Sequence, residues 1–235
     1  TNLAVALAQE TGERVVIVDL DLQFGDVALL LDALPVYTIA DIAKKEQIDG
    51  NLLEECLITH SSGLKILPAP MKPEQAELVE LHHIKEILSL LRQDFDYIVV
   101  DTSRSFAESM LLVLDLSDVI LLVTTLEIPA IKNTKLCLDL MESLHYPEEK
   151  IKMILNRSSR EIGVKIEEAE NAFRRPVDAH IPSDGKVVVL SINRGLPFVI
   201  GAPSSKIAQS IRKIAHLLIE RKEGEHVTPR PSRAR

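Results

Sequence analysis

Arg14-Val-Val-Ile-Val-Asp19-Leu-Asp21 is a run of β-branched residues followed by two carboxylates. A short run that is apolar at every position is typical of a strand buried on both faces, as in parallel sheets. The preceding residues, 1–10, are rich in alanine and predict a helix that ends at Thr11-Gly12. The chain therefore starts with a helix that leads into a buried strand.

The same alternation continues along the chain and predicts its fold class. Further short apolar runs predict strands at 64–67, 97–100, 119–123, 151–155 and 177–181. Helical periodicity between them predicts helices at 77–92, 106–114, 130–144, 164–173, 186–193 and 204–221. Buried strands that alternate with helices predict an α/β fold of three αβα layers with a mainly parallel sheet. In such sheets ligands bind at the carboxyl ends of the strands.

Length and composition predict one soluble domain. The 235 residues are 46% hydrophobic and 26% charged, which is enough to build a full core. We expect one folded domain at 1–222 and a polar, disordered tail at 223–235. The apolar runs are too short to cross a bilayer and no signal peptide is recognisable, so we expect a cytoplasmic protein. The net charge of −8 argues against DNA as a partner.

Carboxylates follow two of the predicted strands. Alternation along a strand would point Asp19 and Asp21 to the same side, where their repulsion calls for a cation or a water network. Two turn-forming acids that end a strand are the alternative. Asp101 follows four apolar residues, a pattern by which nucleotide-binding α/β proteins hold Mg²⁺ through its water shell.

Two later strand ends carry other polar groups. The amide of Asn156 could present a donor and an acceptor to a purine edge, although a turn asparagine is the simpler alternative. Pro182 ends a strand that leads into a helix, with Ser183 or Asp184 as the helix cap. Capping by itself needs no ligand. Because all these groups follow strands of one predicted sheet, we expect them to lie along one edge of it.

Taken together, these segments resemble the MinD/ParA family of P-loop ATPases over residues 1–220. The segments are Asn2-Leu-Ala-Val-Ala-Leu-Ala8, Val18-Asp-Leu-Asp-Leu-Gln23, Tyr97-Ile-Val-Val-Asp-Thr102, Leu155-Asn-Arg157 and Ile181-Pro-Ser-Asp184. Within the family, the chain resembles the CpaE/TadZ-like pilus-assembly branch through two longer segments. These are Asp118-Val-Ile-Leu-Leu-Val-Thr-Thr-Leu-Glu-Ile-Pro-Ala-Ile-Lys-Asn-Thr134 and Ile181-Pro-Ser-Asp-Gly-Lys-Val-Val-Val-Leu-Ser-Ile-Asn-Arg-Gly195.

The resemblance implies ATP and Mg²⁺ as cofactors and assigns roles to the strand ends. Asp21 would take the switch I position that orients the attacking water, and Asp101 would be the Walker B carboxylate on the magnesium water shell. Asn156 would contact adenine, with Arg157 beside the base.

The resemblance also implies a loop over the base and a set of partners. The loop formed by Pro182, Ser183 and Asp184 would close over the base. The expected partners are a second copy of the chain and proteins of a pilus or secretion assembly.

Two departures from the family pattern bear on hydrolysis. The glycine-rich loop that binds phosphates would lie just upstream of Thr1, so we expect an N-terminally truncated domain. After Asp101 the chain reads Thr-Ser-Arg-Ser105, where most of the family has Thr-Pro-Pro-Gly. Ser105 is a poorer substitute for a glycine whose amide approaches the γ-phosphate, so slow or absent ATPase activity is expected.

Three functions fit these features. The first is an ATP-dependent switch that positions or assembles a type IV or Tad-type pilus or a secretion apparatus. The second is a nucleotide-independent scaffold of the same fold, and the third is a DNA-partition ATPase. The basic amphipathic helix at 204–221 could make a peripheral contact at the inner membrane or cell pole. Docking of this helix on the sheet is the favoured interpretation.

Overall fold

The computed structural model describes residues 1–158 and 164–227. The strands within this range are β1 (Val15–Leu20), β2 (Ile58–Thr59), β3 (Lys65–Leu67), β4 (Tyr97–Thr102), β5 (Ile120–Thr124), β6 (Ile151–Ser158) and β7 (Ala179–Pro182). The helices are α1 (Asn2–Thr11), α2 (Val27–Leu30), α3 (Ile39–Ala43), α4 (Gly50–Cys56), α5 (Leu81–Asp94), α6 (Glu108–Leu116), α7 (Ile128–Ser143), α8 (Ile166–Phe173), α9 (Gly185–Arg194), α10 (Phe198–Gly201) and α11 (Lys206–Val227). Two 3₁₀ turns are η1 (Pro73–Leu78) and η2 (Glu148–Lys150). Each predicted strand and helix is present, with small shifts of its ends.

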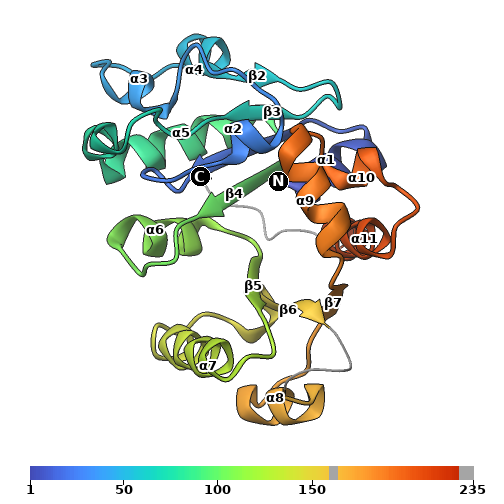
Figure 1. Ribbon diagram of the computed structural model, residues 1–235. Helices are drawn as coiled ribbons and strands as arrows, with labels where there is room; N and C mark the ends of the chain where they lie inside the picture. Colours follow the sequence, from blue (N-terminus) through green and yellow to red (C-terminus); the bar gives the residue numbers. More distant parts are fainter. Residues whose placement is uncertain (159–163, 228–235) are drawn as a thin grey trace.

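The strands form two sheets, in the orders β2-β3-β1-β4 and β5-β6-β7. All neighbours are parallel except β2 and β3, which confirms the predicted α/β fold with mainly parallel strands. A single sheet was expected, but β4 and β5 do not pair. Figure 1 shows these two strands at the facing borders of the two sheets. No strand of the described residues lies between them to join the sheets.

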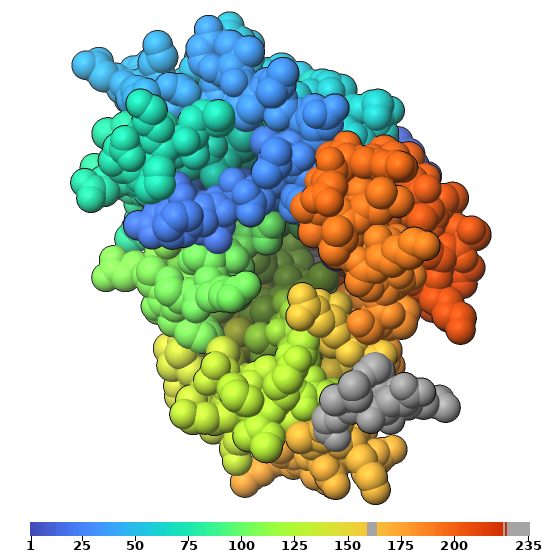
Figure 2. Space-filling view, viewed as in Figure 1, coloured from blue at the N-terminus to red at the C-terminus, as the bar shows by residue number. Residues whose placement is uncertain are grey.

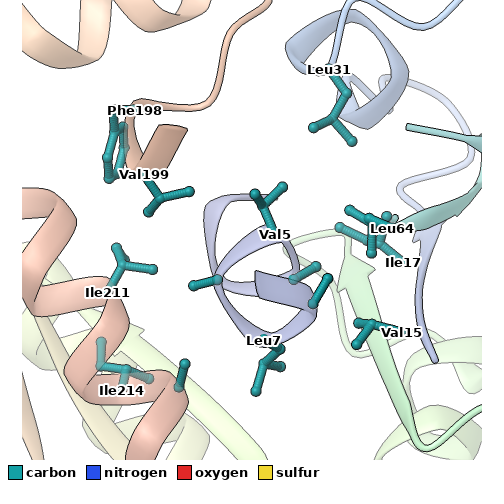
Figure 3. Packing of buried hydrophobic residues seen from close by; sticks show 14 of the residues in the cluster. Val5, Leu7, Val15, Ile17, Leu31, Leu64, Phe198, Val199, Ile211 and Ile214 are labelled. Carbon is teal, nitrogen blue, oxygen red and sulfur yellow. The ribbon is translucent and has the colours of Figure 1, made fainter. Parts of the chain in front are cut away.

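Helix α1 links the two halves of the structure through the main hydrophobic core. It is buried along most of its length and packs between β1 and α11, as Figure 3 shows for Val5, Leu7, Ile211 and Ile214. Ile154 of β6 belongs to the same buried cluster. Because each fully buried aliphatic side chain contributes about 1.5–3 kcal/mol, this cluster stabilises the arrangement of the two sheets.

The last helix is docked, as the favoured interpretation held. Ile207, Ile211 and Ile214 of α11 are buried in the main core, so this apolar face is covered by protein. The helix reaches at least Val227, beyond the expected domain boundary at 222. The rest of the expected tail, 228–235, lies outside the described residues. No helix in the described part of the chain is long and apolar enough to cross a membrane.

Residues 27–63, for which no element was predicted, fold into α2, α3, α4 and β2. These elements span two to seven residues each, too few for periodicity to show. Two of these helices nevertheless have an aspartate at or near their start, a residue type that commonly caps helices. Asp49 accepts a hydrogen bond from the amide of Leu52 at the start of α4 (2.8 Å), and Asp41 accepts one from the amide of Thr38 at the start of α3 (3.0 Å).

Candidate functional site

Asp19 is a buried carboxylate at the carboxyl end of β1. It is 1% exposed, and its two oxygens accept hydrogen bonds from the amides of Asp21 (3.2 Å) and Val27 (3.1 Å). The loop between these amides wraps closely around the carboxylate. A Cβ added to Gly25 would lie 2.4 Å from Asp19 Oδ2, so only glycine fits there without a shift. The Asp19 carboxylate therefore anchors the loop that follows β1.

Asp101 lies beside Asp19 on the neighbouring strand. The two residues are register partners of the parallel pair β1 and β4, and Asp101 is exposed. Burial raises the pKa of Asp19 to about 6, and the charges of Asp101 and Asp21 act in the same direction, while the two amides oppose it. Grouped carboxylates at one strand edge favour binding of a cation, because a cation relieves their repulsion.

The N-terminus of α1 points into the same region. The backbone nitrogen of Thr1 lies within electrostatic range of the carboxylates of Asp101 and Asp19. The first turn of α1 is therefore close to both carboxylates. A helix N-terminus carries free amides and a partial positive charge, which suit an anionic group. Two carboxylates and the N-terminus of a helix are thus placed together.

A distortion of β6 positions Asn156 and Arg157. The register between β6 and β7 shifts between Leu155 and Ser158, and Arg157 adopts a left-handed conformation with φ 52°. The amide of Arg157 donates to Asn156 Oδ1 at 2.9 Å. Non-glycine residues with positive φ are uncommon and concentrate at functional sites. The irregularity lies near the end of β6, which continues to Ser158, and the Asn156 side-chain oxygen accepts a local hydrogen bond there.

The β7–α9 junction brings Pro182, Ser183 and Asp184 to the end of the second sheet. Pro182 is the register partner of Ser158 at the end of β6. Asp184 caps α9, since its Oδ1 accepts a hydrogen bond from the amide of Val187 at 3.1 Å. Of the two residues proposed as the cap, Asp184 fills that role. Ser183 is exposed beside it.

The structure corrects one detail of the sequence interpretation and adds two residues. Asp21 was expected beside Asp19 on the strand, but β1 ends at Leu20, so Asp21 lies in the following turn. Its carboxylate accepts from the amide of Phe24 (3.4 Å), while its own amide binds Asp19. Neither the loop-anchoring role of Asp19 nor the close approach of Gly25 was expected from the sequence, where Asp19 was considered only with Asp21 as a possible cation site.

Parallel strands with carboxylates at their carboxyl ends, facing the N-terminus of a helix, define the class of nucleotide-binding α/β proteins. A family model described as "AAA domain" matches residues 1–153. The septum site-determining protein MinD of Thermotoga maritima is 28% identical over 91% of this chain and 79% of its own length.

Two solved structures extend this similarity to the fold. A ParA family ATPase from Chlorobium tepidum superposes with a TM-score of 0.85 and 28% identity, covering 92% of this chain and 90% of that one. MinD from Pyrococcus horikoshii, complexed with Mg-ADP, gives a TM-score of 0.78 and 26% identity, covering 92% and 87%. The chain belongs to the MinD/ParA family of P-loop ATPases. The Mg-ADP complex confirms nucleotide and magnesium as cofactors in this family.

Proposed function

We propose that this chain is the greater part of an ATP-dependent switch that positions or assembles a type IV or Tad-type pilus or a secretion apparatus. The observation that carries the nucleotide part is the placement of Asp19 and Asp101 on adjacent strands beside the N-terminus of α1. This arrangement fits the phosphates and metal of a nucleotide, because the helix end favours the anion and the carboxylates favour the cation.

The strand ends divide the work of binding. Asp101 would help to hold Mg²⁺, and Asp21 would orient a water near the phosphates from the loop that Asp19 anchors. At the second sheet, Asn156 reads the adenine edge with Arg157 beside the base. The loop of Pro182, Ser183 and Asp184 covers the base, since it joins β7 to the capped end of α9.

A strand and phosphate-binding loop upstream of Thr1 complete the site. The two strand borders that do not pair support this part of the proposal. β1 is buried at five of its six positions, whereas β4 has no buried residue and Val123 of β5 is exposed. Both strands are apolar, and an apolar edge strand without a neighbour tends to pair with other chains and aggregate. Figure 2 shows the surface hollowed between the green α6 region and the orange α9 region. A parallel strand between β4 and β5 would cover both borders and lead directly into α1.

The switch acts as a homodimer through an apolar surface around the site. Phe24, Leu29, Leu34 and Val36 are exposed in the segment around α2, which contacts α9, and Leu34 is 88% exposed. Helix α9 has no buried residue, although Val189 and Ile192 are among its side chains. Apolar groups gathered in this way are typical of a protein interface. The second copy would cover them when nucleotide orders the loops.

The pilus or secretion role rests on the resemblance of residues 118–134 and 181–195 to the CpaE/TadZ-like branch. The switch would work in the cytoplasm and reach the inner membrane or cell pole through its assembly partners. The apolar face of α11 is buried against α1, so that face is not the membrane contact. The net charge of −8 gives no support to a DNA-partition role.

Isothermal titration calorimetry on the chain extended upstream of Thr1 tests the nucleotide switch. We expect Mg²⁺-dependent ATP binding that Asp101→Ala weakens at least tenfold. Asp94→Ala is the matched control, because this exposed carboxylate precedes the opposite end of β4 and should leave binding unchanged. Absence of ATP binding by the extended wild-type chain would eliminate the switch. Dimerisation that ignores ATP in light scattering would then favour the nucleotide-independent scaffold.

A further inference from the structure

Helix α7 exposes a leucine face on the outside of the molecule. Its inner face is fixed by Met141, which is buried, and by Thr134, whose hydroxyl donates to that of Thr124 on β5 at 2.7 Å. The other side carries Leu136 and Leu140, Leu144 follows directly after the helix, and Leu136 is 55% exposed. Figure 1 shows α7 below β5 and β6 and beside α8, on the side of the second sheet away from β3 and β4. No helix of the described residues covers these leucines.

Charged residues beside the leucines are divided by sign along the helix. Lys132 and Lys135 lie in the first half of α7, and Asp139 and Glu142 lie in the second. At about 100° per residue, all four project on the same side of Leu136, while Leu140 and Leu144 project on the other. All four are exposed, and among the described residues none of them forms an ion pair. One flank of the face is therefore basic and then acidic, and the other is apolar.

We propose that this face of α7 binds the same face of a second copy of the chain, with the two helices antiparallel about a two-fold axis. An isologous interface must be self-complementary. A two-fold axis perpendicular to the helix brings the same flank of each copy together and reverses its direction. Lys132 and Lys135 of one copy then lie opposite Asp139 and Glu142 of the other. Leu136 packs against Leu140 across the axis.

The sign pattern selects this occupant and this orientation. A parallel two-fold pair would place the charged flank of each copy against the Leu140 and Leu144 flank of the other, so the charges would lose water without gaining partners. A wholly apolar partner would leave four charges beside the leucines without partners. A partner that presents an acidic group opposite the two lysines and a basic group opposite the two acids pairs all four charges. A second copy of α7 in reverse orientation does so. This interface is separate from the apolar surface of residues 24–36 and α9, and it needs no nucleotide.

Light scattering coupled to size exclusion tests the interface on the 235-residue chain without nucleotide. We expect a concentration-dependent molar mass that rises toward twice the 26.1 kDa of one chain. Leu136→Gln should return it to one chain mass. Leu34→Gln is the matched control, an exposed leucine outside α7 that should leave the self-association unchanged. A wild-type chain that stays monomeric at its solubility limit, or one that only Leu34→Gln dissociates, overturns the interface.

Charge-reversed variants test the antiparallel orientation. Lys132→Glu/Lys135→Glu makes the whole flank acidic, and Asp139→Lys/Glu142→Lys makes it basic. Each variant alone should lose the dimer, while a mixture of the two should form a 1:1 heterodimer that weakens at high salt. Circular dichroism checks that both variants remain folded. If each variant still self-associates as the wild type does, or if the folded variants do not pair when mixed, the proposed interface is wrong.

Discussion

Asp19 and Asp101 are register partners on adjacent parallel strands, yet one is buried and the other is exposed. The buried member has its pKa raised to about 6 from 3.8, chiefly by burial. Between these two pH values the folded chain holds a proton that the unfolded chain has released. The stability that this proton provides is complete below about pH 4 and is lost as pH rises through about 6.

Asp19→Asn should remove this pH dependence. The shift corresponds to at most about 3 kcal/mol, because one pKa unit is worth about 1.4 kcal/mol. We expect the free energy of unfolding of the variant, relative to wild type, to rise by up to this amount between pH 4 and pH 7. Urea unfolding of both proteins at each pH measures this difference in free energy of unfolding. The other carboxylates are shared by both proteins, so their contributions are removed by the subtraction. A difference that stays constant with pH would falsify the assignment of the raised pKa to Asp19.

Gly25→Ala should destabilise the loop after β1. The added Cβ would lie 2.4 Å from Asp19 Oδ2 and 2.5 Å from Ala69 Cβ, so the loop must move. Overpacking of this kind costs about 1–3 kcal/mol. Gly50→Ala is the control, because nothing lies within 4 Å of its added Cβ, and it should be neutral or stabilising in α4. Thermal unfolding of both variants compares them, and equal melting temperatures would rule out the close approach.

Much of the fold was predictable because the strands of a parallel sheet are recognisable in the sequence as short apolar runs. β1, β4 and β6 are runs of branched apolar residues that end in polar groups, and their carboxyl ends lie where parallel pairing requires. Asn156 and Asp184 were found by the same logic. Their roles toward a nucleotide stay predictions.

The rest depends on contacts between distant segments or on short elements. The closeness of Gly25 to Asp19 arises from a loop closing on a strand end, which periodicity does not encode. The separation into two sheets depends on which strand borders meet in space, since β4 and β5 follow each other in the chain without pairing. Elements such as α2 span one helical turn, which is too short to show a periodic pattern of apolar residues in the sequence.

Asp184→Ala should loosen the start of α9. Its carboxylate accepts the amide of Val187, and loss of such a cap costs about 1 kcal/mol. Ser183→Ala removes a neighbouring hydroxyl that makes no cap and should change stability by less than about 0.5 kcal/mol. Hydrogen exchange of the first α9 amides would show faster exchange only in the first variant. Equal exchange in both would mean that α9 does not depend on this cap.

Arg212→Met should weaken the contact between α11 and the start of the chain. The guanidinium pairs with Glu10 of α1, and Nη2 donates to the carbonyl of Val199 at 3.0 Å, with both side chains of the ion pair largely buried. Loss of charged hydrogen bonds in this setting costs about 2 kcal/mol. Lys44→Met is the control, since its pair with Asp41 (2.8 Å) is more exposed and is worth less than about 0.5 kcal/mol. If Glu10→Gln and Arg212→Met act through one pair, the double variant loses less than the sum of the two single losses in urea unfolding. Strict additivity would mean that the two side chains stabilise the helices independently.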